Sequence, residues 1–108
     1  MKEMLKKVLT SKNLVVNNYI ISIGIENNLS LNEFLVLVYL DNDFGNNFVI
    51  EKISSVLGLD INTVMEAFNS LMIKGLVSLE SAKDEMSKLN EVVNLDNVYG
   101  LMGEIASS

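Results

Sequence analysis

The stretch Ile50–Val64 constrains the fold most, because it places two helical patterns on either side of one short turn. Ile50, Ile53 and Leu57 recur at the spacing of one helix face, and Asp60 is a preferred N-cap for a second helix. Gly58 suits the left-handed residue that ends a helix, so the order predicts a helix-turn-helix motif. The second helix is expected to stop at Gly75 and to turn inward Ile61, Val64, Met65, Phe68, Leu71 and Met72.

A capping box precedes this motif at Ser30-Leu31-Asn32-Glu33. In such a box the Ser30 hydroxyl accepts from the Glu33 N–H, and the Glu33 carboxylate accepts from the Ser30 N–H. Leu29 and Phe34 flank the box at the spacing of a hydrophobic staple. The apolar run from Phe34 to Leu40 would suit a buried strand, but the cap favours a buried central helix.

Two extended segments follow the motif. Residues 76–80 and 91–95 predict strands, with Val77, Leu79, Val93 and Leu95 facing inward, and the polar stretch 81–90 predicts an open loop between them. Asp96 is then expected to cap a last helix, whose apolar stripe is Val98, Leu101, Met102 and Ile105. We therefore expect a mainly α fold with a small β-hairpin: a winged helix-turn-helix with extra N- and C-terminal helices.

The N-terminal part divides at residue 12. Residues 1–12 form a basic amphipathic segment of net charge +3, with Met1, Met4, Leu5, Val8 and Leu9 at helical spacing, whereas residues 13–108 carry −9 and form the winged-helix domain. Packing of this segment on the body, or fraying of the segment, is favoured over a membrane role. Ser11 suits the N-cap of a helix over residues 12–26 with an apolar stripe of Val16, Tyr19, Ile20 and Ile23, although its β-branched content also fits a strand.

Composition excludes several classes of function. The chain has 108 residues, enough for one domain, with no Cys, His or Arg. Thiolate and imidazole metal sites, a histidine base and bidentate arginine contacts are therefore ruled out. From Asp41, a calcium loop would need Gly at position 6 and Glu at position 12, but Gly45 is position 5 and Lys52 position 12. We expect no enzyme, cofactor or metal, and, without a signal peptide or membrane span, a cytoplasmic protein.

The chain resembles the N-terminal domain of DnaD-type primosomal proteins of low-GC Gram-positive bacteria. The resemblance rests on Leu14–Tyr19 before the capped helix, on the turn Leu57-Gly58-Leu59-Asp60, and on Met72–Glu80 leading into the hairpin. It implies a winged helix that self-associates and contacts other proteins of the replication initiation and restart machinery, which loads the helicase. In that family a second, helical domain supplies much of the DNA binding, and its Tyr-and-Trp motif is missing here because the chain has no Trp.

In a DNA-reading winged helix the second helix of the motif enters the major groove. Candidate DNA contacts on this helix are Asn62, Thr63, Asn69, Ser70 and Lys74, joined by Lys83 and Lys88 in the wing. Glu66 offsets Lys74, so a solvated face of this helix is favoured over base readout. In the wing, Asp84 and Glu85 lie between the lysines, and a solvated charged loop fits as well as contact with backbone phosphate.

The apolar helix faces near the two ends of the sequence favour self-association, because a three-helix core with one hairpin would not cover them all. The candidate self-association residues are Val16, Tyr19, Ile20, Ile23, Val98, Leu101, Met102 and Ile105, so that residues 1–25, together with 97–105, would form a homo-oligomer interface. Two function classes follow: an assembly module that binds itself and primosome or helicase-loading proteins, with weak or indirect DNA contact, or a dimeric transcriptional regulator. The acidic body and the lack of Arg favour the first.

Overall fold

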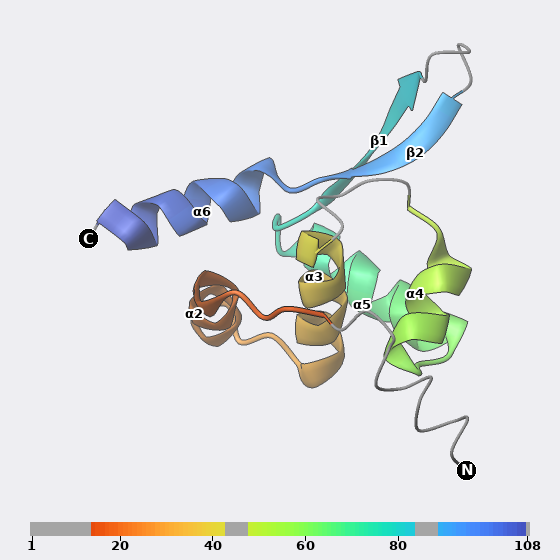
Figure 1. Ribbon diagram of the computed structural model, residues 1–108, viewed down its shortest axis with the longest axis horizontal. Coiled ribbons are helices and arrows are strands. Elements are labelled where there is room, and N and C mark those ends of the chain that lie inside the picture. Colours follow the sequence, from red (N-terminus) through yellow and green to blue (C-terminus); the bar gives the residue numbers. More distant parts are fainter. Residues whose placement is uncertain (1–13, 43–47, 84–88, 108) are drawn as a thin grey trace.

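The computed structural model describes residues 14–42, 48–83 and 89–107, which form five helices and one antiparallel hairpin (Figure 1). The helices are α2 (Asn18–Glu26), α3 (Leu31–Asn42), α4 (Ile50–Leu57), α5 (Ile61–Ile73) and α6 (Asp96–Ser107), and the strands are β1 (Ser78–Lys83) and β2 (Leu89–Asn94). Helices α3, α4 and α5 with the hairpin make the winged helix-turn-helix, and α2 and α6 are the extra helices at its two ends. The predicted fold class is confirmed.

Helix α3 lies at the centre of the molecule and packs against α2, α4 and α5. Its residues 36–40 are all buried, as the apolar run predicts. The capping box begins it: the Glu33 N–H donates to Ser30 Oγ at 3.2 Å, and the Ser30 N–H donates to Glu33 Oε1 at 3.1 Å. A local cap and a continuous apolar surface together place this helix inside the core.

The turn between α4 and α5 follows the expected chemistry. Gly58 has φ +70°, and its N–H donates to the Ser54 carbonyl at the end of α4. Asp60 Oδ1 accepts from the Thr63 N–H at 2.8 Å and so caps α5. A left-handed glycine followed at once by a capped helix keeps the connection short and fixes where α5 starts.

The buried face of α5 is narrower than predicted. Val64, Ala67, Phe68 and Leu71 are buried at spacings of three and four residues, and Met72 is partly buried against the core. Ile61 and Met65 are 46% and 38% exposed, so their assignment to the core was wrong. The buried stripe, which includes Ala67, is turned away from Ile61 and Met65.

Removing the α5 cap tests the importance of this start signal. Asp60→Ala should lower the free energy of unfolding by about 1 kcal/mol, because the N–H of Thr63 loses its acceptor. Urea unfolding followed by circular dichroism would measure this loss. Asn69→Ala, at an exposed position on the same helix, is the matched control and should cost less than about 0.5 kcal/mol. Equal losses would contradict the capping role.

The strands are displaced from their predicted positions. Leu76 and Val77 are buried just before β1, and the pairing runs from Ser78 opposite Asn94 to Lys83 opposite Leu89. The strands extend into the stretch predicted as an open loop, because backbone pairing continues past the last buried side chains. Val93 and Leu95 are buried as expected, whereas Leu79, farther along the projecting hairpin, is exposed. The Phe48 N–H donates to the Glu91 carbonyl at 2.9 Å, which ties the segment before α4 to β2.

Both end helices start differently from the sequence-based expectation. Helix α2 begins at Asn18, with Asn17 as its N-cap, and Ser11 lies outside the described residues. Residues 14–17 are not helical; the Asn42 side chain holds them by accepting from the Val15 N–H and donating to the Val15 carbonyl. In α6 Asp96 is the first helical residue rather than the cap, and its N–H donates to Asn94 Oδ1 at 2.8 Å. Asparagine side chains replace backbone partners at both places.

Candidate interaction surfaces

The predicted DNA-contact residues do not form one accessible cationic face. Asn62 and Asn69 are exposed on α5, whereas Thr63 and Ser70 are half-buried. Lys74, at the C-cap of α5, points its ammonium group at a carboxylate of the same chain. Lys83 is the last residue of β1, but its side chain and all of Lys88 lie outside the described part of the chain.

The carboxylate that holds Lys74 belongs to Glu33, which the sequence predicted only as a capping residue. Glu33 Oε2 accepts from Lys74 Nζ at 2.8 Å and from Ser70 Oγ at 2.9 Å, while Oε1 serves the Ser30 N–H. Glu33 is 7% exposed. One buried carboxylate therefore joins the start of α3 to the end of α5 and satisfies four hydrogen-bonding groups through its side chain and backbone.

The charge on Glu33 is strongly stabilised. Burial of the carboxyl group raises its pKa, but hydrogen bonds from Lys74, from the backbone and hydroxyl of Ser30, and from Ser70 outweigh burial and lower the pKa from 4.5 to about 2. The carboxylate therefore stays ionised at every physiological pH, and Lys74 stays bound to it. Two of the five candidate DNA-contact residues on α5, Ser70 and Lys74, are therefore engaged in hydrogen bonds within the chain.

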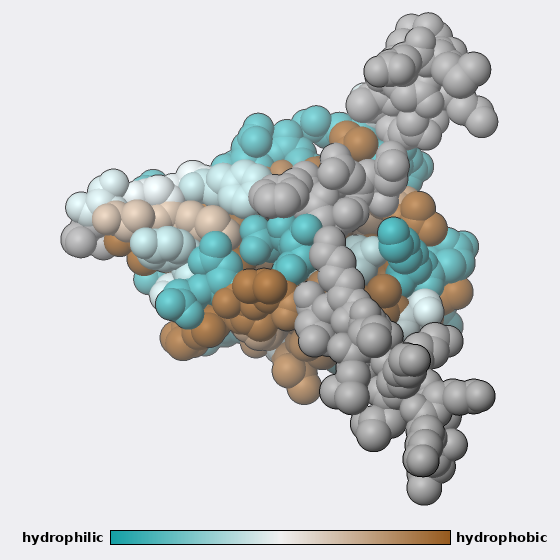
Figure 2. All heavy atoms as spheres, in the orientation of Figure 1, coloured by the Kyte–Doolittle hydropathy of each residue, from teal (hydrophilic) through white to brown (hydrophobic). Residues whose placement is uncertain are grey.

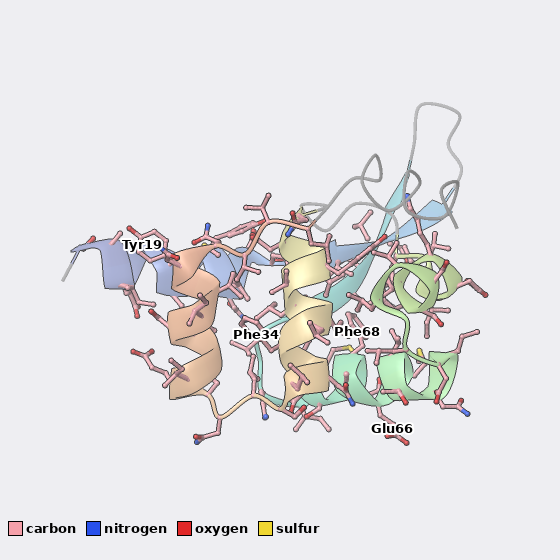
Figure 3. All side chains as sticks on the ribbon, turned by 60° about the horizontal axis from the view of Figure 1, so that its bottom comes forward. Tyr19, Phe34, Glu66 and Phe68 are labelled. Carbon is pink, nitrogen blue, oxygen red and sulfur yellow. The ribbon has the colours of Figure 1, made fainter. Side chains whose placement is uncertain are left out.

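The rest of the α5 surface is neutral, acidic or apolar. Figure 3 shows Glu66 pointing outward from α5. Ile73 is 86% exposed at the end of the helix, and Ile61 and Met65 are exposed at its beginning. Side chains are described for two lysines, Lys52 and Lys74. Lys74 is paired with Glu33, and no described carboxylate lies within ion-pair distance of Lys52. Such a helix neutralises few phosphates.

The predicted self-association residues fall into two groups. Ile20, Ile23 and Val98 are completely buried inside the chain, because α2 and α6 pack against each other, so placing them in an interface was wrong. Leu101, Met102 and Ile105 are half-buried and also pack on the core. Val16 and Tyr19 are exposed. The two stripes predicted to need a partner molecule largely cover one another.

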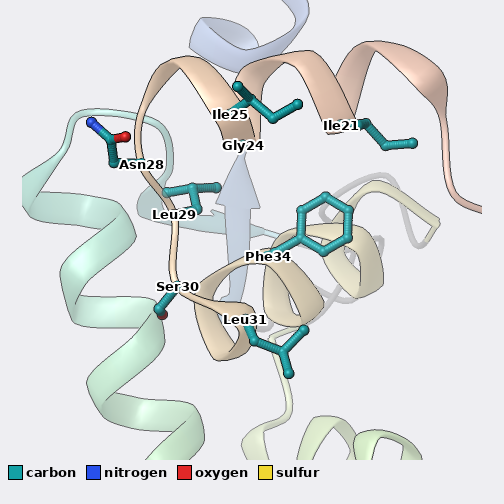
Figure 4. A pocket seen from close by; sticks show the side chains of 8 residues that line it. All are labelled: Ile21, Gly24, Ile25, Asn28, Leu29, Ser30, Leu31 and Phe34. Carbon is teal, nitrogen blue, oxygen red and sulfur yellow. The ribbon is translucent and has the colours of Figure 1, made fainter.

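An apolar groove between α2 and α3 is the surface that the sequence analysis missed. Figure 2 shows hydrophobic residues at the surface over α2 and the start of α3, and Figure 4 shows the groove that they border. The groove has a volume of about 490 Å³, and its lining is mostly apolar, with two polar residues: Ile21, Gly24, Ile25, Asn28, Leu29, Ser30, Leu31 and Phe34. Ile25 and Leu31 are 72% and 70% exposed.

The groove depends on a close approach at its floor. A Cβ atom on the buried Gly24 would lie 3.1 Å from the Phe34 ring, tighter than ordinary van der Waals contact, so a larger residue would require the ring to shift away from α2. Ile21 and Ile25 are four residues apart on α2, and this spacing was the sequence signal for an apolar face. A smaller polar hollow adjoins the groove at Ser30, and Glu66 lines it.

Other types of site find no support. Among the described side chains no three acidic residues gather to hold a metal ion. The acidic loop predicted over residues 41–47 begins inside α3 at Asp41 and Asn42, and its residues 43–47 lie outside the described part of the chain. No helix among residues 14–42, 48–83 and 89–107 is long and apolar enough to cross a membrane. The sequence matches no family model and no curated protein.

Proposed function

We propose that this chain is an oligomerisation and protein-interaction module of the cytoplasmic machinery for bacterial DNA replication initiation and restart. In this role it resembles the N-terminal domain of DnaD-type primosomal proteins. It binds further copies of itself and other primosome or helicase-loading proteins, and it contacts DNA weakly or indirectly. It performs no catalysis.

One observation carries this proposal. Residues 61–74, which make up α5 and its C-cap, contain one lysine, Lys74. Its ammonium group is bound to the buried carboxylate of Glu33. The helix that would enter the major groove thus offers no free cation, whereas tight DNA binding requires many phosphate contacts. The apolar residues exposed just before and in the first turn of α2, Val16 and Tyr19, support binding to protein instead.

The second candidate, a dimeric winged-helix transcriptional regulator, is supported by Asn62 and Asn69. Both are exposed on α5, and an asparagine amide can bind the edge of adenine in the major groove. Such readout would act together with phosphate contacts made outside α5, so it predicts sequence-selective binding that weakens steeply with salt.

A titration separates the two functions. For the assembly module, light scattering should show self-association at micromolar concentration, and duplex DNA should bind no more tightly than about 10⁻⁵ M at physiological salt. Lys74→Gln should leave this weak DNA binding unchanged, as should the matched Lys52→Gln. A strict monomer that binds one DNA sequence selectively, with a steep salt dependence, would overturn the proposal in favour of the regulator.

Tyr19 provides a surface test of the association. Because it is exposed on α2, Tyr19→Lys should weaken self-association by about tenfold without loss of folding, as expected when a charge enters an apolar interface. Exposed Asn69→Lys on α5 is the control and should leave association unchanged.

A further inference from the structure

We propose that residues 1–12 bind in the groove between α2 and α3 of their own chain, as an amphipathic helix that covers Ile25, Leu31 and Phe34. The groove is an exposed apolar surface, and the proposal assigns it an occupant from the same molecule. It is independent of the proposed function, because it concerns a contact within one chain.

The shape and polarity of the two partners match. The groove is bordered by side chains from two helices and from the connection between them, with Phe34 between the α2 side chains and Leu31 (Figure 4). Met1, Met4, Leu5, Val8 and Leu9 recur at the spacing of one helix face. Insertion of an apolar helix face into a groove is a recurrent mode of recognition.

Charge complementarity favours this segment as the occupant. Residues 1–12 carry Lys2, Lys6, Lys7 and Lys12 against one Glu, whereas none of the described residues that line the groove is cationic. Glu26 follows Ile25 at the end of α2, and exposed Glu66 lines the adjoining hollow. An apolar face flanked by lysines would therefore meet an apolar groove flanked by carboxylates.

The length of the chain allows the contact within one molecule. Val15 is bonded to Asn42, the last residue of α3, and the groove lies at the first turn of that helix. The 12 residues of α3 span about 18 Å, and a helix over residues 1–12 would have about the same length. A tethered segment also reaches an effective concentration in the millimolar range, well above that of a second copy at micromolar protein.

A single introduced thiol tests whether the groove is covered, since the chain has no Cys. In the full chain, Leu31→Cys should react with a negatively charged aromatic disulfide about tenfold more slowly than in the same chain carrying Leu5→Glu and Leu9→Glu, which place two acids on the apolar face. Ile73→Cys, which is exposed on α5, should react at the same rate in both backgrounds. Equal rates for Leu31→Cys would overturn the proposal.

A second measurement identifies whose segment fills the groove. Oxidation of a full chain with Met4→Cys and Leu31→Cys should give a disulfide within one molecule, with a yield independent of protein concentration. Disulfide-linked dimers whose yield rises with concentration would overturn the proposal, because they would assign the groove to a second copy. Light scattering of the parent chain reports self-association separately, so failure of this contact and failure of the proposed function are distinguishable.

Discussion

Replacing Glu33 with alanine is expected to lower the free energy of unfolding by about 3 kcal/mol at pH 7. The substitution removes the reciprocal half of the capping box and leaves Lys74 and Ser70 without their acceptor. Removal of one partner of a fully buried ion pair costs about 3–5 kcal/mol. The Lys74 side chain is 31% exposed and regains water, which keeps the loss at the lower end. Urea unfolding would measure it.

Two further variants show whether the effect of Glu33→Ala depends on the buried position of this carboxylate and on its pairing with Lys74. Glu66→Ala removes an exposed carboxylate of α5 and should change stability by less than about 0.5 kcal/mol. Lys74→Met leaves the Glu33 carboxylate buried without a cation but still bonded to Ser30 and Ser70, so it should cost about 2 kcal/mol. If Glu33→Ala cost no more than Glu66→Ala, the buried carboxylate would not hold α3 to α5.

The same group sets a dependence on pH. The pKa of Glu33 is lowered in the folded chain, so its contribution is complete above the ordinary value of 4.5 and is lost as the pH falls from 4.5 to about 2. After allowance for solvent near the partly exposed Lys74, this contribution is about 2 kcal/mol. The free energy of unfolding should be measured at pH 7 and near pH 2 for the parent chain and for Glu33→Gln. Between these two pH values the variant should lose about 2 kcal/mol less stability than the parent chain. An unchanged loss in the variant would contradict the lowered pKa.

Signals that act within four residues were readable from the sequence. The Ser30–Glu33 box, the left-handed Gly58 and the Asp60 cap depend on neighbours along the chain, and the structure confirms all three. Helix α3 followed from the cap together with its apolar run. Because these signals mark where helices begin and end, they were enough to predict the order of elements in a winged helix-turn-helix.

Long-range pairing was not readable in the same way. Lys74 is 41 positions from Glu33, and nothing local distinguishes a lysine that binds a buried carboxylate from one that faces DNA. The mutual coverage of Ile20, Ile23 and Val98 likewise depends on how α6 returns to α2. Amphipathic stripes show that a residue needs cover but not which element provides it, so the interface prediction failed where α2 meets α6.

Phe68→Ala should have the largest effect in the core, about 4 kcal/mol. Phe68 is 1% exposed and lies inside the molecule between α3 and α4, as Figure 3 shows. Its ring centroid is 4.5 Å from that of Phe48, with the two planes inclined by 30°. Truncation removes the ring and leaves a cavity that the surrounding helices cannot close, and the aromatic pair is lost as well. Chemical denaturation at pH 7 would give the change.

The aromatic pair also predicts an effect on the hairpin. Phe48 holds β2 through its N–H bond to Glu91 and holds α5 through its ring, so its ring links the wing to the helical body. Phe48→Ala, from a half-buried site, should cost only about 2 kcal/mol but should speed amide hydrogen exchange at Val92 and Val93 more than in α3. Met65→Ala, from an exposed position on α5, is the control and should leave exchange in β2 unchanged. A uniform increase across α3 and β2 would mean that Phe48 stabilises the whole fold rather than the wing.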